Sequence, residues 1–225
     1  MGQAIGQVLP LAVGVAISPV PIIAVVLMLV TPRARVNGPA FVAGWLLGLG
    51  VVGAIVLLVA SSVEATNDGE PATWVNVLEL VFGALLVLAS LKQWRGRPRS
   101  DQEPATPKWM GAIEGFGPGK ALVAAAVVAA VNPKNLPLAV AAAASIAGTG
   151  ISGGEQAVAY VVFALVGAVG VAAPVVIYFA MGEKAGPLLD RLRQWMARNN
   201  AVIMAVLLLV IGANLIGDGI AGLSS

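Results

Sequence analysis

The chain has 225 residues, of which 59% are hydrophobic and only 11% carry a charged side chain, and its formal net charge is +2. A soluble domain contains about 45–50% apolar and about 25% charged residues, so the composition excludes a soluble protein and indicates an integral membrane protein. The sequence contains no cysteine and no histidine. This excludes thiol–disulfide chemistry, Cys/His metal sites and a histidine base, and we expect neither a metal nor a cofactor.

Six apolar segments are long enough, at about 20 residues each, to cross a bilayer. In chain order they are residues 4–30, 38–61, 74–91, 117–147, 156–181 and 200–220. The expected fold is an all-α integral membrane protein in which residues 1–91 and 115–225 form two three-helix units, joined by a cytoplasmic connector at residues 92–114. The N-terminus lacks a basic region and a small-residue cleavage site, so we expect the first segment to be a span and not a removed signal.

Basic residues predict the orientation of these spans. Eleven of the thirteen Lys and Arg residues follow the first, third and fifth spans, whereas the alternate segments at residues 62–73 and 148–155 contain none. The two exceptions are Lys120 and Lys134, both in the fourth span. By the positive-inside rule the basic segments face the cytoplasm. The sequence therefore predicts a multi-pass protein of the cytoplasmic membrane with both termini extracytoplasmic.

Two of the predicted spans contain proline-rich interruptions. The first span carries Ser18-Pro19-Val20-Pro21, and the fourth carries Asn132-Pro133-Lys134-Asn135-Leu136-Pro137. Proline removes a backbone donor and clashes with the preceding turn, so helices 1 and 4 are predicted to break and to resume near Ile22 and Leu138. Each interruption lies in the first span of a three-span half, and a three-span unit repeated in tandem must be inverted. Matched interruptions in the two halves of a transporter mark a binding site at the repeat interface.

Lys134 is the first candidate for a functional residue. A lysine at this depth costs about 2.5–3.5 kcal/mol on insertion scales, and intramembrane charges usually face a pathway. Together with the positive ends of the two resumed half-helices, it suits an anionic group such as a carboxylate, phosphate or sulfate. A structural ion pair or snorkelling to a surface is the alternative. The predicted substrate-binding residues are Ser18, Pro19, Pro21, Asn132, Pro133, Lys134 and Asn135.

Glu79 is a carboxylate inside the third predicted span. The sequence leaves three roles open for it: an ion pair with Lys134, proton coupling, or contact with the outer membrane interface. Lys120 follows a glycine-rich stretch, but Glu114 and Ala121 stand where a Walker A phosphate loop requires Gly and Ser/Thr. We therefore expect no ATPase activity, and the protein is not predicted to be an enzyme.

Several stretches resemble one family along essentially the whole chain. The chain is similar to the GAP group, which includes glycopeptidolipid- and sulfolipid-addressing proteins, within the wider LysE-type exporter superfamily. The Asn-Pro-Lys triplet is widely shared among LysE-type exporters, while Ser-Pro-x-Pro is closer to the GAP group. The stretches that carry the resemblance are Ser18-Pro19-Val20-Pro21-Ile22-Ile23-Ala24, the loop with Arg33 and Arg35, Phe41-Val42-Ala43-Gly44-Trp45 and Asn132-Pro133-Lys134-Asn135.

The resemblance implies export of an envelope glycolipid, or of a component of it, towards the cell surface. It supports roles for Pro19, Pro21, Asn132, Pro133 and Lys134. It also implies glycolipid cargo, envelope lipid synthesis or export machinery, and a second copy of the chain as partners, and no nucleic acid is expected. Two alternatives stay open: a proton-coupled exporter of a small charged metabolite that uses Glu79, and a non-transporting envelope assembly factor.

Overall fold

The structure is a computed structural model that describes residues 1–64, 73–96 and 113–224. Within these residues all regular secondary structure is helical, and no strand occurs. Four helices are long and apolar enough to cross a membrane, and the number rises to six if each of two bent helix pairs is counted as one span. The predicted class, a multi-span helical membrane protein, is confirmed, while the count of six and the inversion of the two halves stay predictions.

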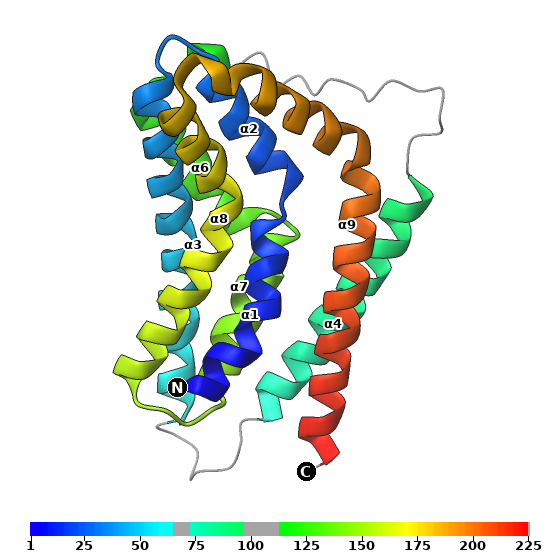
Figure 1. Ribbon diagram of the computed structural model, residues 1–225. Coiled ribbons are helices and arrows are strands. Elements are labelled where there is room, and N and C mark those ends of the chain that lie inside the picture. The colour runs from blue at the N-terminus through cyan, green and yellow to red at the C-terminus, as the bar shows by residue number, and fades with distance from the viewer. Residues whose placement is uncertain (65–72, 97–112, 225) are drawn as a thin grey trace.

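The same order of elements occurs twice along the chain: a bent helix pair and then two long helices (Figure 1). The helices of the first half are α1 (Gly2–Ala16) and α2 (Pro19–Leu29), which meet at 53°, then α3 (Ala34–Glu64) and α4 (Thr73–Arg95). The second half comprises η1 (Ile113–Gly115), α6 (Pro118–Val131) and α7 (Asn135–Ala147), which meet at 67°, then α8 (Gly153–Met181), η2 (Gly182–Lys184) and α9 (Ala185–Ser224). Most of the predicted connector lies at residues 97–112, outside the described residues.

Both breaks lie where the sequence predicted them, but the prolines act differently from the expectation. The second half-helices begin at Pro19 and Asn135, each three residues before the predicted restart at Ile22 or Leu138. Pro19 is the first residue of α2, where a helix has no partner for the N–H that proline lacks. Pro137 likewise falls in the first turn of α7. The predicted restarts near Ile22 and Leu138 are therefore three residues late: Pro19 begins α2, and Pro137 lies within the first turn of α7.

Glycines let helix backbones approach one another closely. α3 packs against α6, α1 against α8, and α4 against α9. A Cβ atom at Gly44 would collide with the backbone carbonyl of Leu122 on α6, and one at Gly170 would collide with the carbonyl of Ala16 at the end of α1. Small residues at such contacts are typical of membrane helices, because lipid supplies no hydrophobic driving force and close van der Waals packing replaces it.

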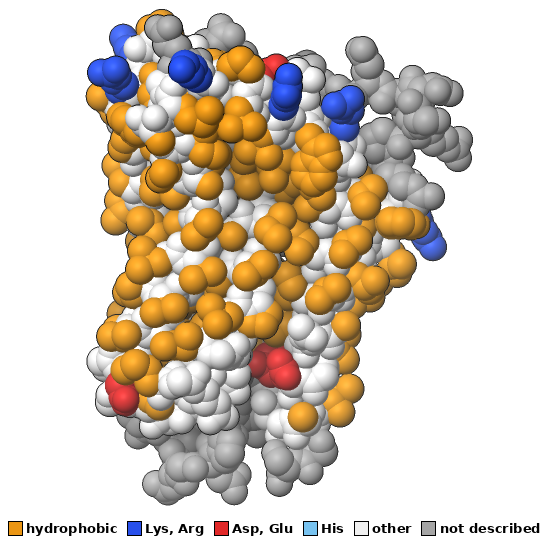
Figure 2. Space-filling model, viewed as in Figure 1, with side chains coloured by type: hydrophobic (Ala, Val, Ile, Leu, Met, Phe, Trp, Pro, Cys, Tyr) orange, Lys and Arg blue, Asp and Glu red, His pale blue; other side chains and the backbone are white. Residues whose placement is uncertain are grey.

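Charged groups divide the molecule into two ends. Lys and Arg side chains gather at the upper end in Figure 2, and apolar side chains cover most of the visible face between the two ends. Both chain termini lie at the lower end in Figure 1, and α9 crosses the upper end before it runs down beside α4. Most basic side chains of the described residues that are visible in Figure 2 therefore lie at one end of the fold, opposite the termini, as the alternation of basic and non-basic loops predicted.

Candidate functional site

The two breaks lie against each other inside the helix bundle. Ser18, which separates α1 from α2, donates a hydrogen bond of 3.0 Å from its Oγ to Oδ1 of Asn135, the first residue of α7. Both side chains are buried. The backbone N–H of Lys134 donates to Oδ1 of Asn132 at 2.9 Å and closes the turn that contains Pro133. The structure thus brings the polar residues of the two predicted motifs into one cluster.

The side chain of Lys134 ends on the backbone of α1. Its Nζ donates hydrogen bonds to the carbonyl oxygens of Gly14 at 2.6 Å and Ile17 at 3.1 Å, and the residue is only 4% exposed. The last carbonyls of a helix have no partner within the helix and carry the negative end of its dipole. The ammonium therefore caps α1 at the break. The structure gives Lys134 no carboxylate partner within the described residues.

Glu79 is paired with a residue other than Lys134. Its Oε1 accepts a hydrogen bond of 2.9 Å from Oγ of Ser145 on α7, and the residue is only 6% exposed. Ser145 stands eleven residues after Lys134, which is about 16 Å along a helix at 1.5 Å per residue. An ion pair between Glu79 and Lys134 is therefore absent from this structure, and proton coupling by Glu79 stays a prediction.

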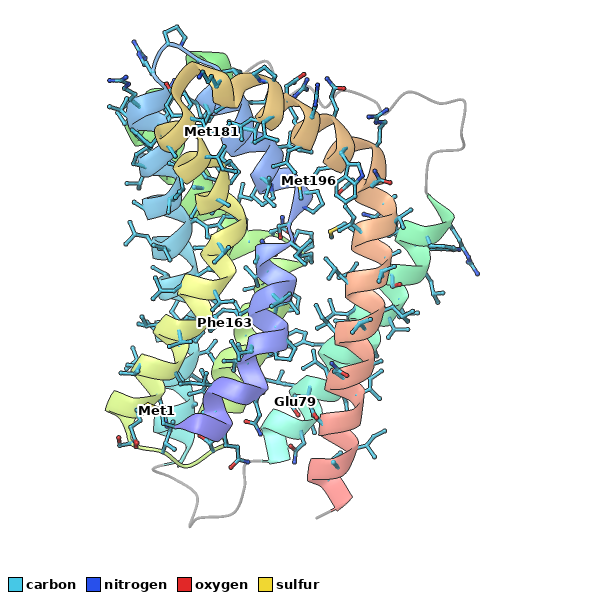
Figure 3. The ribbon with its side chains drawn as sticks, in the orientation of Figure 1. Met1, Glu79, Phe163, Met181 and Met196 are labelled. Carbon is cyan, nitrogen blue, oxygen red and sulfur yellow. The ribbon has the colours of Figure 1, made fainter. Side chains whose placement is uncertain are left out.

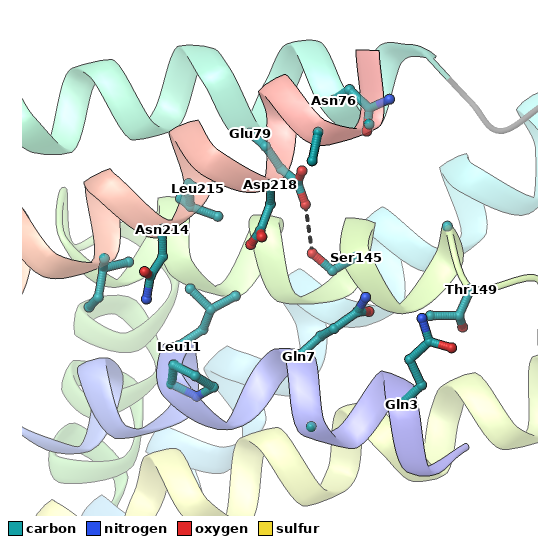
Figure 4. Close-up of a pocket in the computed structure, with 16 residues that line it drawn as sticks. Gln3, Gln7, Leu11, Asn76, Glu79, Ser145, Thr149, Asn214, Leu215 and Asp218 are labelled. Atoms are coloured by element: carbon teal, nitrogen blue, oxygen red, sulfur yellow. Dashed lines mark hydrogen bonds between the residues drawn. The ribbon is translucent and has the colours of Figure 1, made fainter. Parts of the chain in front are cut away.

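A pocket of about 520 Å³ lies beside Glu79, between α1, α4, α7 and α9. Its volume falls within the range of about 300–1,000 Å³ that is usual for small-molecule sites. Figure 3 shows Glu79 near the end of the molecule that carries Met1, and Met181 near the opposite end. Figure 4 shows the polar side chains that line the pocket, which are Gln3, Gln7, Asn76, Glu79, Ser145, Thr149, Asn214 and Asp218.

Among the described residues that line the pocket there are two carboxylates, Glu79 and Asp218, and no Lys or Arg. Its other polar groups are amides and hydroxyls, which both donate and accept hydrogen bonds. Apolar side chains, among them Leu11, Ile211 and Leu215, complete the lining. The pocket is thus suited to hydrogen-bonding a polar ligand, and it lacks the full positive charge that the sequence analysis expected at a binding site.

Of the predicted site residues, only Glu79 lines this pocket. Ser18, Pro19, Pro21, Asn132, Pro133, Lys134 and Asn135 lie at the breaks, and their role in substrate binding stays a prediction.

Most of the pocket could not be predicted from the sequence, because its residues come from α1, α4, α9 and the C-terminal part of α7 with the two residues that follow it, which are far apart along the chain. One signal was available: the polar pairs Gln3/Gln7 and Asn214/Asp218 are each spaced i, i+4 within apolar segments. This spacing places both members of a pair on one face of a helix.

The sequence matches the family described as Sap, sulfolipid-1-addressing protein, over residues 8–221. The match includes both breaks, Lys134, and the two carboxylates of the pocket. None of the curated proteins and none of the solved structures matches the chain. Because the match spans nearly the whole sequence, the chain belongs to the sulfolipid-1-addressing protein family.

Proposed function

We propose that this protein translocates an envelope glycolipid, or a component of it, across the cytoplasmic membrane, as a LysE-type exporter with six spans in two inverted halves. The family match and the multi-span helical fold support a glycolipid-related role in a membrane. The observation that carries the proposal is the polar pocket between α1, α4, α7 and α9, in a chain that is otherwise largely apolar.

An amphipathic cargo needs a polar site for its head group while its tails stay in the bilayer. Leaving one amide or hydroxyl without hydrogen bonds in hydrocarbon costs about 2–7 kcal/mol, so a head group with several such groups does not cross unaided. The pocket replaces water with side-chain partners from four helices. In the proposed mechanism the α4–α9 pair moves relative to α1 and α7, which opens and closes the head-group site.

The breaks supply the second part of the proposed mechanism. Discontinuous helices at the repeat interface let one half of a transporter rock against the other around a central site. Here Lys134 and the Ser18–Asn135 hydrogen bond hold the two broken pairs together. By the positive-inside rule the basic end faces the cytoplasm, so the pocket, at the end with the termini, is the outward-facing end of the path.

The proposal is tested by lipid analysis of a deletion strain, in which surface-extractable lipids are compared with total cell lipids. The strain is complemented with wild type, with the double variant Glu79→Gln/Asp218→Asn, or with Glu155→Gln. Glu155 is a partly exposed carboxylate that does not line the pocket, so its variant is the matched control, and immunoblots confirm equal membrane levels. We expect one glycolipid to remain in the cell but to disappear from the surface, and wild type and Glu155→Gln to restore it.

Glycolipid export would be refuted if the deletion strain had the same surface-extractable lipids as wild type. If the double variant restored the surface glycolipid as well as wild type did, the export proposal would stand, but the pocket would not be part of the transport path. Co-purification of an envelope enzyme, with no lipid movement by the protein in reconstituted vesicles, would favour the assembly-factor alternative.

A proton-coupled exporter of a small charged metabolite is the second candidate, and one observation favours it: two carboxylates line the same pocket. Acidic residues inside a membrane commonly form proton relays in transporters. In vesicles that contain the purified protein, an imposed pH gradient would then drive metabolite uptake in wild type but not in Glu79→Gln.

A further inference from the structure

The lining of the pocket between α1, α4, α7 and α9 discriminates between kinds of head group. We infer that the pocket takes the neutral, hydroxyl-rich sugar part of a glycolipid and disfavours its anionic groups. This inference rests on the proposed function, because it specifies which part of the cargo occupies the site. It differs from the sequence-based prediction, which placed an anionic group beside Lys134.

The first argument is the charge of the lining. Glu79 and Asp218 both belong to it, and no Lys or Arg in the described part of the chain does. Lys134 is bound to the carbonyls of α1, about 16 Å along α7 from Ser145. Most Lys and Arg side chains visible in Figure 2 lie at the opposite end of the molecule. A sulfate, phosphate or carboxylate in the pocket would therefore meet two like charges and no Lys or Arg side chain among the described lining residues, and such juxtaposition is strongly unfavourable where water is partly excluded.

The second argument is the mixture of donors and acceptors. Four amides line the pocket, and each offers an acceptor oxygen and an NH₂ donor. Oε1 of Glu79 accepts from Ser145, and its Oε2 has no hydrogen-bond partner within the described part of the chain. A sugar hydroxyl donates and accepts at the same atom, so this lining can satisfy both functions. The four amides are Gln3, Gln7, Asn76 and Asn214.

A simple cation fits the lining less well, since it needs acceptors alone and would leave the amide donors without partners. The described residues also contain no cluster of three or more acidic, His or Cys side chains that is suited to a metal ion. The alternation of donors and acceptors therefore favours a hydroxyl-rich ligand over a metal ion.

The third argument is the distribution of apolar side chains. On α1, Pro10 and Leu11 lie nearer the break than Gln3 and Gln7 do, whereas on α9 the polar Asn214 lies between the apolar Ile211 and Leu215. A sugar ring has C–H faces as well as hydroxyls, and an attached acyl chain is wholly apolar. The lining thus combines polar groups for hydroxyls with apolar side chains for the ring face or the first methylenes of the chain, in a volume of about 520 Å³.

The test measures binding to the full chain in phosphatidylcholine nanodiscs by microscale thermophoresis. Three probes share one palmitoyl or hexadecyl chain: a neutral disaccharide ester, the same ester bearing one sulfate, and a quaternary ammonium amphiphile. We expect the neutral ester to bind at least about tenfold more tightly than the sulfated one, since like charges carry a penalty of this order. Free disaccharide should compete with the neutral ester.

Variants assign this preference to the pocket. In the double variant Glu79→Gln/Asp218→Asn we expect the sulfated ester to bind within about threefold of the neutral one, because the amides keep hydrogen bonding but remove the charge. Glu155→Gln is the control: Glu155 is partly exposed and outside the pocket, and it forms a capping box with Ser152, which Gln also supports. This control should keep the wild-type preference.

Equal or tighter binding of the sulfated ester by wild type would overturn the inference, and so would stronger binding of the ammonium amphiphile. If no ester binds while the lipid analysis still shows export, the inference fails and the proposed function stands. If the neutral ester binds with the expected preference but the deletion strain keeps its surface lipids, the inference about the pocket stands and the proposed export function is refuted.

Discussion

Replacing Lys134 with methionine tests whether its ammonium caps α1. The change keeps an unbranched side chain, one heavy atom shorter, but removes the donor to the carbonyls of Gly14 and Ile17. Each buried acceptor left without a partner costs about 1–3 kcal/mol, and loss of a cation at a helix C-terminus costs about 0.3–2 kcal/mol. Removing an intramembrane charge returns about 2.5–3.5 kcal/mol. The midpoints of these ranges leave a net destabilisation of about 2 kcal/mol.

The assay is SDS-induced unfolding in mixed micelles, followed by tryptophan fluorescence. Lys134→Gln should be intermediate, because its amide retains two donors. Lys120→Met is the matched control: Lys120 is exposed near the start of α6, and its replacement should change the free energy of unfolding by less than about 0.5 kcal/mol. Wild-type or higher stability of Lys134→Met would refute the cap. Unchanged stability with loss of lipid export would instead support Lys134 as a cargo-binding residue.

Three further predictions concern packing, the break and orientation. Gly44→Ala should destabilise the protein by about 1–3 kcal/mol, because its Cβ meets the Leu122 carbonyl, whereas Gly50→Ala on the same helix meets open space and serves as the control in the same unfolding assay. Ser18→Ala should cost about 0.6–1.7 kcal/mol, the range for an interhelical hydrogen bond in a membrane, because Asn135 Oδ1 loses its donor; no change would show that this bond does not join the two breaks. The chain contains no cysteine, so single added cysteines report orientation. A cysteine at either terminus should react with an impermeant maleimide in intact cells, and one in the loop between α2 and α3 should react only after lysis. The reverse labelling pattern would show the opposite orientation.

Several features of the protein follow from its sequence alone. Apolar composition requires a membrane environment whatever the arrangement of the helices. Proline lacks an N–H in every context, so the positions of the two breaks were predictable, although the residues at which α2 and α7 begin were not. The alternation of basic and non-basic loops likewise predicted that the basic segments share one end of the molecule.

The tertiary structure alone decided which polar groups meet. The sequence predicted an anionic cargo or a carboxylate as the partner of Lys134. In the fold its ammonium instead donates to the carbonyls of Gly14 in α1 and of Ile17 directly after α1, which are 120 and 117 residues away along the chain. The fold also places Glu79 where its carboxylate accepts a hydrogen bond from Ser145, and it brings residues from α1, α4, α7 and α9 together around the pocket. The physical reason is that a helix presents its side chains locally, while its partners depend on which backbones approach, and close contacts such as Gly44 against Leu122 and Gly170 against Ala16 fix that approach.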